Sequence, residues 1–565
     1  MKIFFCIFFC SFSVFGQNNY PQDYFSAPLN IPMQLSGNFG EMRPNHFHSG
    51  FDFKTQQKEG LNVYASADGY ISRIKIAHGG YGKAIYITHP NGFTTVYGHL
   101  KCGLGEIEKY IKKEQYKSQS YEIEVMPNPN DLIIKKGDVI ALSGNTGGSD
   151  GPHLHFEFRD TQSEKIINPM FFGFNKQLID TKRPIVNSLM VYPIDANSIV
   201  NQAKRPISVS LSLQDDGSYI AEKILASGTI GFGITTIDLD NVSWNANGIY
   251  SVHTFLNGKQ FFGYQFDTFS FDETRYVNAL IDFSRYKKLG QRVQKLFMKN
   301  AYSLSLIKAT PDNGIVTVSP NMTQTYRIEI ADFNQNITKV CIPIQYSSLP
   351  AKVNEEPITS KYLVKARREN SFALENVSVF FPANTFYDDF FMNFEVKNKT
   401  LFLHDETVAA HSNFSITFED SISTDKESEK IFIASIDGNK IYYNTTKRKN
   451  TAFTTYTKYL GQYKLMKDTI APKISIAKNF SEKWISTQKE IQLIVSDDLS
   501  GIKSYNGYLN NNWILLEYES KTKKLTHSFA DGIVAEGKNE LKVVVTDNVG
   551  NSTIFETHFF RSQKP

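Results

Sequence analysis

The stretch Gly151-Pro152-His153-Leu154-His155-Phe156-Glu157-Phe158 is the most informative part of this chain. Polar and apolar residues alternate along it, which is typical of a β-strand, and every second side chain of a strand points to the same face. His153 and His155 are therefore predicted to aim their imidazoles at one point. Two converging imidazoles indicate a metal site or a proton-transfer site.

Two upstream motifs supply the other groups that such a site needs. His48-Ser49-Gly50-Phe51-Asp52 places an imidazole and a carboxylate four residues apart, and Tyr97-Gly98-His99-Leu100 adds another imidazole. A hydrolytic zinc takes three protein ligands and keeps a fourth position for water, whose pKa falls to about 7. His48, Asp52 and one histidine of the HxH pair meet that count. The two remaining imidazoles can take the proton of the water and stabilise the oxyanion or protonate the leaving amine.

Histidines are concentrated around these motifs. Of the twelve in the chain, those that precede Phe156 are His46, His48, His78, His89, His99, His153 and His155. A lone HxH is also explained by the polar face of a strand, but packing explains such clustering poorly. His89 precedes Pro-Asn-Gly and His78 precedes Gly-Gly, so both are expected in turns. His46 lies two residues before His48 and, in an extended segment, competes with it for the metal.

These motifs resemble those of the lysostaphin-type or LytM-like zinc endopeptidases, which cut peptide cross-bridges in bacterial peptidoglycan. The resemblance spans about residues 37–169 and includes the Gly144-Asn145-Thr146-Gly147 turn, with all motifs in the order of the family. It implies one Zn²⁺ per catalytic domain, held by His48, Asp52 and His155. It also implies that His99 and His153 act on the water and the oxyanion. The choice of His155 over His153 as a ligand comes from the resemblance and not from spacing.

The function predicted from this resemblance is an exported zinc metalloendopeptidase that hydrolyses peptide cross-bridges of bacterial peptidoglycan. Some members of the family have lost ligands and only activate other cell-wall hydrolases. The alternative function is therefore a non-catalytic envelope scaffold or activator, but no ligand position is vacant here. Gly-rich hairpin turns also occur in lipoyl and biotinyl carrier domains, which have no His/Asp cluster.

Residues 105–131, between His99 and the Gly144 turn, depart from the family pattern. Ile107 and Ile111 are four residues apart, which predicts a short amphipathic helix, and residues 121–125 read as extended. The sequence leaves open whether this insertion walls the cleft, covers it or is a surface elaboration.

The predicted fold class is mostly all-β: an antiparallel LytM-like peptidase domain with a short helical insertion, followed by Ig-like β-sandwich domains. Abundant Tyr (29) and Phe (44) favour strands over helices. Alternating runs predict antiparallel strands at 69–76, 83–88 and 93–97, and 139–143 leads into the HxH strand. A chain of 565 residues is too long for one core. The expected domains are 17–183 for the peptidase, 184–346 for an Ig-like sandwich, 347–467 for a β-rich domain of unnamed fold and 468–565 for a second Ig-like sandwich.

A faint repeat supports the Ig-like prediction for the tail. Residues 328–338 and 543–553 each run as a strand, a turn headed by Asp332 or Asp547, and a resumed strand. Acidic residues at 497–498 also begin a turn. They can bind calcium, but capping of the turn is favoured because Asp, Ser and Gly supply local hydrogen bonds.

The N-terminus predicts export. Residues 1–16 combine one Lys with a short apolar run, as in a secretory signal peptide, with cleavage expected before Gln17. Lipid attachment at Cys10 is disfavoured because no small residue precedes it. No later segment is long enough to span a membrane. Because of the predicted signal peptide, the mature chain is expected in the periplasm, the cell envelope or outside the cell. Cys102 and Cys341 fall in different predicted domains and are expected to be separate buried thiols.

The net charge and the composition limit the classes of binding partner that the sequence predicts. A net charge of +4 is small for this length, and nucleic-acid binding, which needs a concentrated basic face, is not predicted. The predicted partners are peptidoglycan peptides and an envelope protein bound through the C-terminal β domains.

Overall fold

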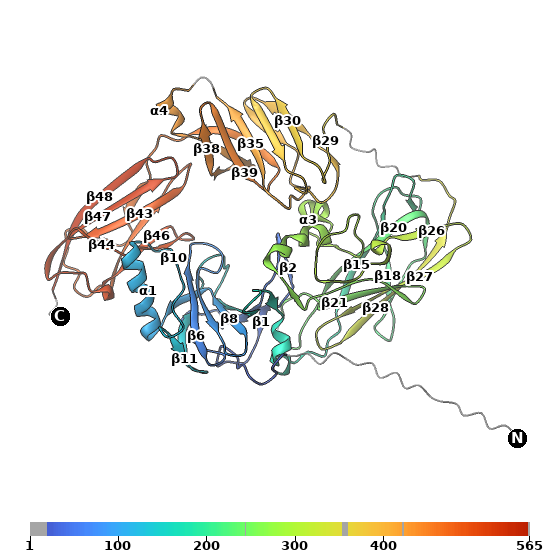
Figure 1. The fold of residues 1–565 in the computed structure, drawn as a ribbon, viewed down its shortest axis with the longest axis horizontal. Coiled ribbons are helices and arrows are strands. Elements are labelled where there is room, and N and C mark those ends of the chain that lie inside the picture. Colours follow the sequence, from blue (N-terminus) through green and yellow to red (C-terminus); the bar gives the residue numbers. More distant parts are fainter. Residues whose placement is uncertain (1–19, 243, 353–359, 421–422, 563–565) are drawn as a thin grey trace.

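The computed structural model describes residues 20–242, 244–352, 360–420 and 423–562 (Figure 1). The predicted signal peptide, residues 1–16, lies outside them. Strands make up 47% of the structure and helices 9%, which confirms the mostly β fold class. Four β-rich bodies follow one another along the chain, and we call them the first, second, third and last bodies (Figure 1). No helix of the described residues is long and apolar enough to cross a membrane.

The first body is built on one large antiparallel sheet with the path β1-β4-β13-β8-β7-β6-β10. The predicted strands at 69–76, 83–88, 93–97 and 139–143 are confirmed. The elements of this body are β1 (Leu35–Gly37), β2 (Met42–Arg43), β3 (His46–Phe47), β4 (Phe51–Lys54), β5 (Asn62–Tyr64), β6 (Gly69–Ile76), β7 (Lys83–Thr88), β8 (Phe93–Gly98), β9 (Leu100–Gly103), α1 (Gly105–Ser118), β10 (Ile123–Val125), β11 (Ile133–Ile134), β12 (Val139–Ser143), β13 (His153–Asp160), β14 (Ile166–Ile167), and the 3₁₀ turns η1 (Pro169–Phe172) and η2 (Phe174–Lys176).

Strand β13 lies in the interior of this sheet, between β4 and β8. Its even-numbered side chains Leu154, Phe156 and Phe158 are fully buried, and the Phe158 ring stacks on Phe172 with centroids 4.0 Å apart. A buried side chain of this size contributes about 1.5–3 kcal/mol. Because neighbouring side chains of a strand point to opposite faces, this aromatic core commits the odd-numbered side chains, including both histidines, to the other face.

The insertion contains the predicted helix. Helix α1 buries Ile107 and Ile111 beside Gly103, and ends where Gln119 adopts a left-handed backbone with φ 47°. Its other side carries polar groups that contact the last body, so the insertion is a docking surface within the chain.

The second body contains a mixed sheet with the path β17-β15-β20-β28-β27-β21-β22-β25. Strand β28 pairs in parallel with β19 and β20, which departs from a purely antiparallel Ig-like sandwich; the Ig-like assignment of residues 184–346 stays a prediction. Its elements are β15 (Ile185–Pro193), β16 (Ile199–Val200), β17 (Ile207–Val209), β18 (Leu211–Leu213), β19 (Tyr219–Ala221), β20 (Ile224–Ile237), β21 (Ser251–Leu256), β22 (Lys259–Gln265), β23 (Thr268–Phe269), η3 (Phe271–Tyr276), α2 (Val277–Leu280), α3 (Phe283–Leu289), β24 (Gln294–Lys295), β25 (Ile307–Ala309), η4 (Pro311–Gly314), β26 (Val316–Val318), β27 (Thr323–Ala331) and β28 (Ile337–Tyr346).

The first and second bodies share a single hydrophobic core. Strand β23 of the second body pairs with β14 and so extends the large sheet of the first. Phe269 is fully buried, with its ring 5.0 Å from that of Phe39 and 5.7 Å from that of Phe47. Phe47 directly precedes His48, so packing in the second body supports the segment that carries a predicted metal ligand.

The third body consists of two five-stranded antiparallel sheets around its own core. Its elements are β29 (Leu363–Val364), β30 (Asn370–Leu374), β31 (Val377–Phe381), β32 (Phe390–Phe391), β33 (Phe394–Lys397), β34 (Thr400–Leu403), β35 (Phe414–Glu419), α4 (Asp425–Ser428), β36 (Ile431–Asp437), β37 (Lys440–Asn444), β38 (Thr446–Lys449), β39 (Ala452–Thr457) and β40 (Gly461–Lys467).

The last body is a sandwich of two four-stranded sheets that share one core. The two predicted hairpins are confirmed, as β27 and β28 in the second body and as β47 and β48 here. Its elements are β41 (Lys473–Ile476), β42 (Glu490–Ser496), β43 (Ile502–Leu509), β44 (Asn512–Ile514), β45 (Glu517–Glu519), β46 (Lys524–Ser528), η5 (Phe529–Asp531), β47 (Gly537–Asp547) and β48 (Ser552–Arg561).

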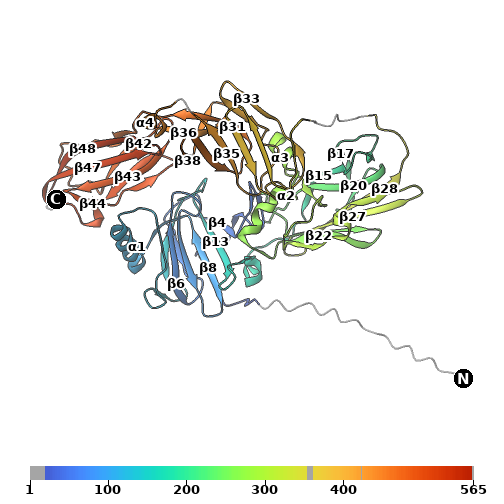
Figure 2. The same ribbon diagram turned by 45° about the horizontal axis from the view of Figure 1, so that its top comes forward.

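The last body returns to the first, so the four bodies close into a ring (Figures 1 and 2). At the closure, Glu517 forms ion pairs with Lys83 (2.7 Å) and Lys112 (3.3 Å), and the Tyr116 hydroxyl donates to Asp531. Lys112 and Tyr116 belong to α1. The insertion therefore joins the first body to the last body.

The two cysteines of the described chain are separate free thiols, as predicted. Both are only half-buried, so the expectation that they are buried is wrong. Cys102 lies in β9 and Cys341 in β28.

Candidate metal centre and catalytic cleft

Strand register brings the separate motifs together. Within the sheet, His155 of β13 lies directly opposite Asp52 of β4 on one side and Gly98 of β8 on the other. His99 follows Gly98 and is therefore carried to the same place. Residues that are far apart in sequence meet because β13 pairs with both strands.

Gly50 allows this approach. A Cβ at Gly50 would come within 2.2 Å of the carbonyl oxygen of Phe156 in β13. Any side chain at this position would push β4 away from β13, so the segment between His48 and Asp52 needs a glycine there.

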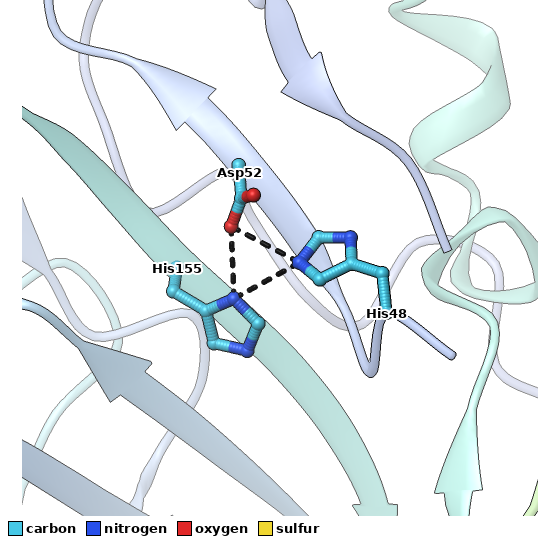
Figure 3. A group of neighbouring side chains, drawn as sticks. All are labelled: His48, Asp52 and His155. Carbon is cyan, nitrogen blue, oxygen red and sulfur yellow. Dashed lines mark hydrogen bonds and ion pairs between the residues drawn. The ribbon is translucent and has the colours of Figure 1, made fainter. Parts of the chain in front are cut away.

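His48, Asp52 and His155 form a compact buried cluster (Figure 3). Their exposed fractions are 2%, 4% and 3%. Asp52 Oδ1 lies 3.1 Å from His48 Nε2 and 2.9 Å from His155 Nδ1, and the two ring nitrogens are 3.2 Å apart. Three potential ligand atoms thus face one point.

The outer nitrogens of the two histidines fix their tautomers. His48 Nδ1 lies 2.7 Å from the carbonyl oxygen of Asn38, and His155 Nε2 lies 2.8 Å from a carboxylate oxygen of Glu157. Because these oxygens only accept, both outer nitrogens must donate. In the neutral rings the inner nitrogens then carry lone pairs that face each other and Asp52. These three atoms form a candidate metal site, and an N₂O donor set with a carboxylate suits zinc.

The pKa values of His155 and Asp52 also reflect their mutual contacts. Burial alone would lower the pKa of His155, but hydrogen bonds to Asp52 and Glu157 raise it to about 9. Burial would raise the pKa of Asp52, yet the charge of His48 and hydrogen bonds from His153 and His155 hold it well below its usual range. The cluster therefore favours positive charge at its centre.

Three residues that the sequence analysis did not assign to the site hold its ligands in place. Arg43 donates to Asp52 Oδ2 at 2.5 Å. Glu157, which is fully buried, accepts from His155 and is ion-paired with Arg159 at 2.7 Å. A carboxylate behind a ligating histidine orients the ring and increases its basicity. The alternation of β13, which puts residue 157 on the face of His153 and His155, is the signal that points to Glu157.

His99 and His153 stand beside the cluster, with ring centroids 4.7 Å apart. His99 Nδ1 lies 2.8 Å from the carbonyl oxygen of Thr146, and His153 Nδ1 lies 2.8 Å from that of Gly151. Both Nδ1 atoms must therefore donate, which leaves Nε2 of each ring as a proton acceptor. His153 Nε2 lies 3.4 Å from Asp52 Oδ1 and so faces the cluster.

His99 has a backbone conformation that non-glycine residues rarely adopt, with φ 57°. Strain of this kind costs about 1–3 kcal/mol and tends to occur at functional sites. Burial and the charges of His155 and His153 lower the pKa of His99 to about 3. The side chain is thus neutral at physiological pH.

The other histidines lie outside the cluster. His46 is the first residue of β3; its side chain is exposed and its Nδ1 lies 2.9 Å from the carbonyl oxygen of Pro44. The strand stops at Phe47, so the alternation does not continue to His48. His89 begins the hairpin turn at residues 89–92, as predicted: the amide of Gly92 donates to its carbonyl oxygen. Its side chain is buried, and both ring nitrogens are bonded within the first body. His78 contacts Tyr505 of the last body.

An open cleft with a volume of about 1080 Å³ lies over the cluster. Asp52, His99 and His153 reach its floor, and Arg43 and Lys54 are among the residues that line it. Helix α1 does not contribute to the lining. The cleft is large enough for a peptide segment of several residues.

The last body reaches the edge of this site. Lys521 donates to the backbone oxygen of Asn145 at 2.7 Å and to its side-chain oxygen at 3.1 Å. Asn145 belongs to the Gly144 turn, and the next residue, Thr146, accepts the hydrogen bond from His99. A Cβ at Gly144 would come within 2.8 Å of the carbonyl oxygen of His99, so this turn packs directly on the strand that carries it.

Two family models match the chain. Residues 46–120 match peptidase family M23, and residues 361–468 match a Zu5-like domain. The first match covers the His48 and His99 motifs and ends before the HxH strand. The second covers most of the third body, whose fold the sequence analysis left unnamed.

Curated relatives resemble the same N-terminal region. An uncharacterized metalloprotease of Haemophilus influenzae is 35% identical over 145 residues, which is 26% of this chain and 24% of the relative. The DD-carboxypeptidase/endopeptidase Mpg of Neisseria meningitidis is 38% identical over 112 residues, or 20% of each chain. The peptidoglycan DD-endopeptidase ShyA of Vibrio cholerae is 31% identical over 136 residues, covering 23% of this chain and 26% of the relative. The chain thus matches about a quarter or less of the length of these relatives.

Proposed function

The N-terminal body of this chain is a LytM-like peptidase domain of family M23, and from this premise we propose that the protein is an exported zinc endopeptidase that hydrolyses peptide cross-bridges of bacterial peptidoglycan. The observation that carries the proposal is the convergence of three lone-pair donors beside two imidazoles on the floor of an open cleft. The peptidase family and the names of the relatives support the choice of substrate class.

Each site residue has a distinct role in this proposal. His48 through Nε2, Asp52 through Oδ1 and His155 through Nδ1 would hold the zinc. When bound, zinc supplies the Lewis acidity that makes water a nucleophile near neutral pH. Arg43 and Glu157 position two of the ligands.

His99 and His153 handle protons. Each ring is anchored through Nδ1 to a backbone carbonyl, so its Nε2 can accept a proton without a change of tautomer or orientation. One imidazole takes the proton of the attacking water, and the other stabilises the developing oxyanion or protonates the leaving amine. The low pKa of His99 keeps that ring neutral before reaction and makes it a ready donor once it is protonated.

Residues 1–16 as a signal peptide would deliver the chain to the cell envelope, where this substrate lies. The β-rich tail would bind an envelope partner or the wall itself. Hydrolysis of a D,D-bond is the specificity that the names of two relatives suggest for the cleft.

The experiment that tests the proposal combines metal analysis with product analysis. The purified chain should contain one zinc per molecule and release soluble fragments from purified sacculi, whose masses identify the bond that is cut. His153→Ala should retain zinc and release nothing, which excludes a contaminating hydrolase. A zinc-loaded chain that releases no fragments would support the alternative, a scaffold or activator of other hydrolases.

A further inference from the structure

A second group of carboxylates lies at the junction of the first and second bodies, away from the catalytic cleft. Asp180 follows the last 3₁₀ turn of the first body, Asp238 follows β20, and Asp332 follows β27. One carboxylate oxygen of each lies within 4.8 Å of the others. These residues line a pocket together with Asp240 and Asn247. We call Asp180, Asp238 and Asp332 the junction cluster.

Two buried polar atoms at the junction cluster have no hydrogen-bond partner among the described residues. They are Oδ1 of Asp238, whose exposed fraction is 5%, and Oδ1 of Asn247, whose exposed fraction is 8%. Asn247 pairs with Asp238 through backbone hydrogen bonds, and its side-chain amide donates to Asp240. An orphaned buried oxygen costs about 1–3 kcal/mol, so two beside one another need an explanation.

The negative charge of the junction cluster is also uncompensated. Within the part of the chain that the structure describes, no Lys, Arg or His forms an ion pair with any of its three members. Burial, together with the charges of Asp180 and Asp332, raises the pKa of Asp238 to about 8. Three carboxylates in this setting repel one another unless a cation lies between them.

The last body provides an internal comparison. Asp468, Asp497 and Asp547 also place carboxylate oxygens within 4.8 Å of one another. There, backbone and side-chain N–H groups satisfy the carboxylates: Asp468 accepts from the amides of residues 470 and 500, Asp497 from those of 499 and 501, and Asp547 from those of 549 and 551. This agrees with the turn capping that the sequence predicted for Asp497. In the junction cluster, Asp180 accepts from the amide of residue 182 and Asp332 from the amide and side chain of residue 336, but Oδ1 of Asp238 has no such donor.

We propose that the junction cluster is a structural calcium site, with Asp180, Asp238 and Asp332 as carboxylate ligands and Asn247 Oδ1 as a neutral one. The available ligand atoms are all oxygens, which suits hard cations. Zinc prefers nitrogen and sulfur ligands, so this ligand set does not favour it. Calcium takes six to eight oxygens in flexible geometry, whereas magnesium demands a near-ideal octahedron and retains its waters. A buried cluster of three carboxylates and an amide oxygen fits calcium better.

The site is connected to the catalytic centre through one asparagine. Asn38 of the first body exchanges two hydrogen bonds with Gly248, at 2.6 and 2.9 Å, and Gly248 follows the proposed ligand Asn247. The backbone oxygen of Asn38 in turn accepts from His48 Nδ1. Calcium at the junction would therefore steady the segment that orients one of the proposed zinc ligands.

Calcium binding can be measured directly on the full chain. The protein, stripped of metal and resupplied with one equivalent of zinc, is titrated with CaCl₂ and in parallel with MgCl₂ by calorimetry, and its melting temperature is followed. We expect one calcium per chain, a rise in melting temperature with calcium, and a weaker response to magnesium. Calcium should reach saturation at about 10 mM, since extracellular modules bind it with dissociation constants of roughly 10⁻⁴–10⁻³ M.

Two variants locate the site. Asp238→Asn should lose both the heat of calcium binding and the calcium-dependent rise in melting temperature. Asp215→Asn makes an equal charge change at an exposed position of the same body and should keep both. Without calcium, Asp238→Asn should melt no lower than the unmodified chain because it relieves repulsion. That expectation separates loss of binding from loss of folding.

Three results would overturn the proposal. The first is an unmodified chain that binds no calcium at the highest concentration. The second is calcium binding that persists in Asp238→Asn. The third is binding that is lost in Asp497→Asn and kept in Asp238→Asn, which would place the ion in the last body. Because none of these measurements uses hydrolysis, they stand whether or not the proposed peptidase activity is found.

Discussion

The pair His155→Ala and His153→Ala tests the division of labour in the HxH motif. The two residues share one face of β13, two positions apart, and a sequence pattern cannot tell a ligand from a proton acceptor. The structure separates them: His155 Nδ1 faces His48 and Asp52, whereas His153 Nδ1 is tied to Gly151. His155→Ala should therefore remove a ligand, and His153→Ala should remove only a catalytic group.

The expected magnitudes differ enough to measure. Binding of structural zinc is worth about 10–16 kcal/mol over four ligands, so one ligand contributes about 3 kcal/mol and its loss weakens zinc binding about 100-fold. His155→Ala also removes a hydrogen bond to the fully buried Glu157, at a further cost of about 1 kcal/mol to folding. His153 is partly exposed and makes no contact with Glu157, so His153→Ala should change zinc affinity less than about threefold.

Zinc affinity would be measured by competition with a chromophoric chelator, and zinc content by mass spectrometry after gel filtration. Hydrolysis would be followed on purified sacculi at saturating zinc. We expect His155→Ala to lose most zinc and all hydrolysis, and His153→Ala to keep zinc and lose hydrolysis. An empty site in His153→Ala, or a filled one in His155→Ala, would refute the assignment.

Three further changes probe the ring and the shared core. Glu517→Gln should weaken the docking of the last body by about 1 kcal/mol, a modest value because the group is partly exposed. The ion pairs lower the pKa of Glu517 from 4.5 to about 2, so the stability difference from the unmodified chain should be full above pH 4.5 and vanish as the pH falls toward 2. Urea unfolding at several pH values can check this. Phe269→Ala should destabilise the shared core by about 3–5 kcal/mol in urea unfolding, and Phe380→Ala, an exposed control in the third body, by less than about 1 kcal/mol; equal effects would contradict a shared core. Lys521→Ala should lower turnover by up to about fivefold with zinc retained, because it frees Asn145 in the turn that holds His99, and unchanged turnover would show that the last body does not act on that turn.

The residues that meet at the candidate metal centre could be predicted because each belongs to a short local pattern. A strand presents every second side chain to one face, so the HxH pair had to converge, and Asp52 had to lie near His48 across a glycine. Strand lengths, the helix of the insertion and the two hairpins of the tail follow from the same local periodicities. The choice between His153 and His155 depended on resemblance to a family, and the structure accounts for it through the partners of their Nδ1 atoms.

Interactions between distant segments could not be predicted in this way. Arg43 reaches Asp52 across a turn, and the insertion, whose role the sequence left open, holds the last body. The segments that follow β20 and β27 and the end of the first body meet at the junction cluster. No local period relates such segments, because their separation depends on how whole sheets pair and pack. The sequence by itself predicted which groups of the first body are candidates to bind zinc and to move protons. Only the tertiary structure decided which side chains hold those groups, and which carboxylates lie together without a counter-charge.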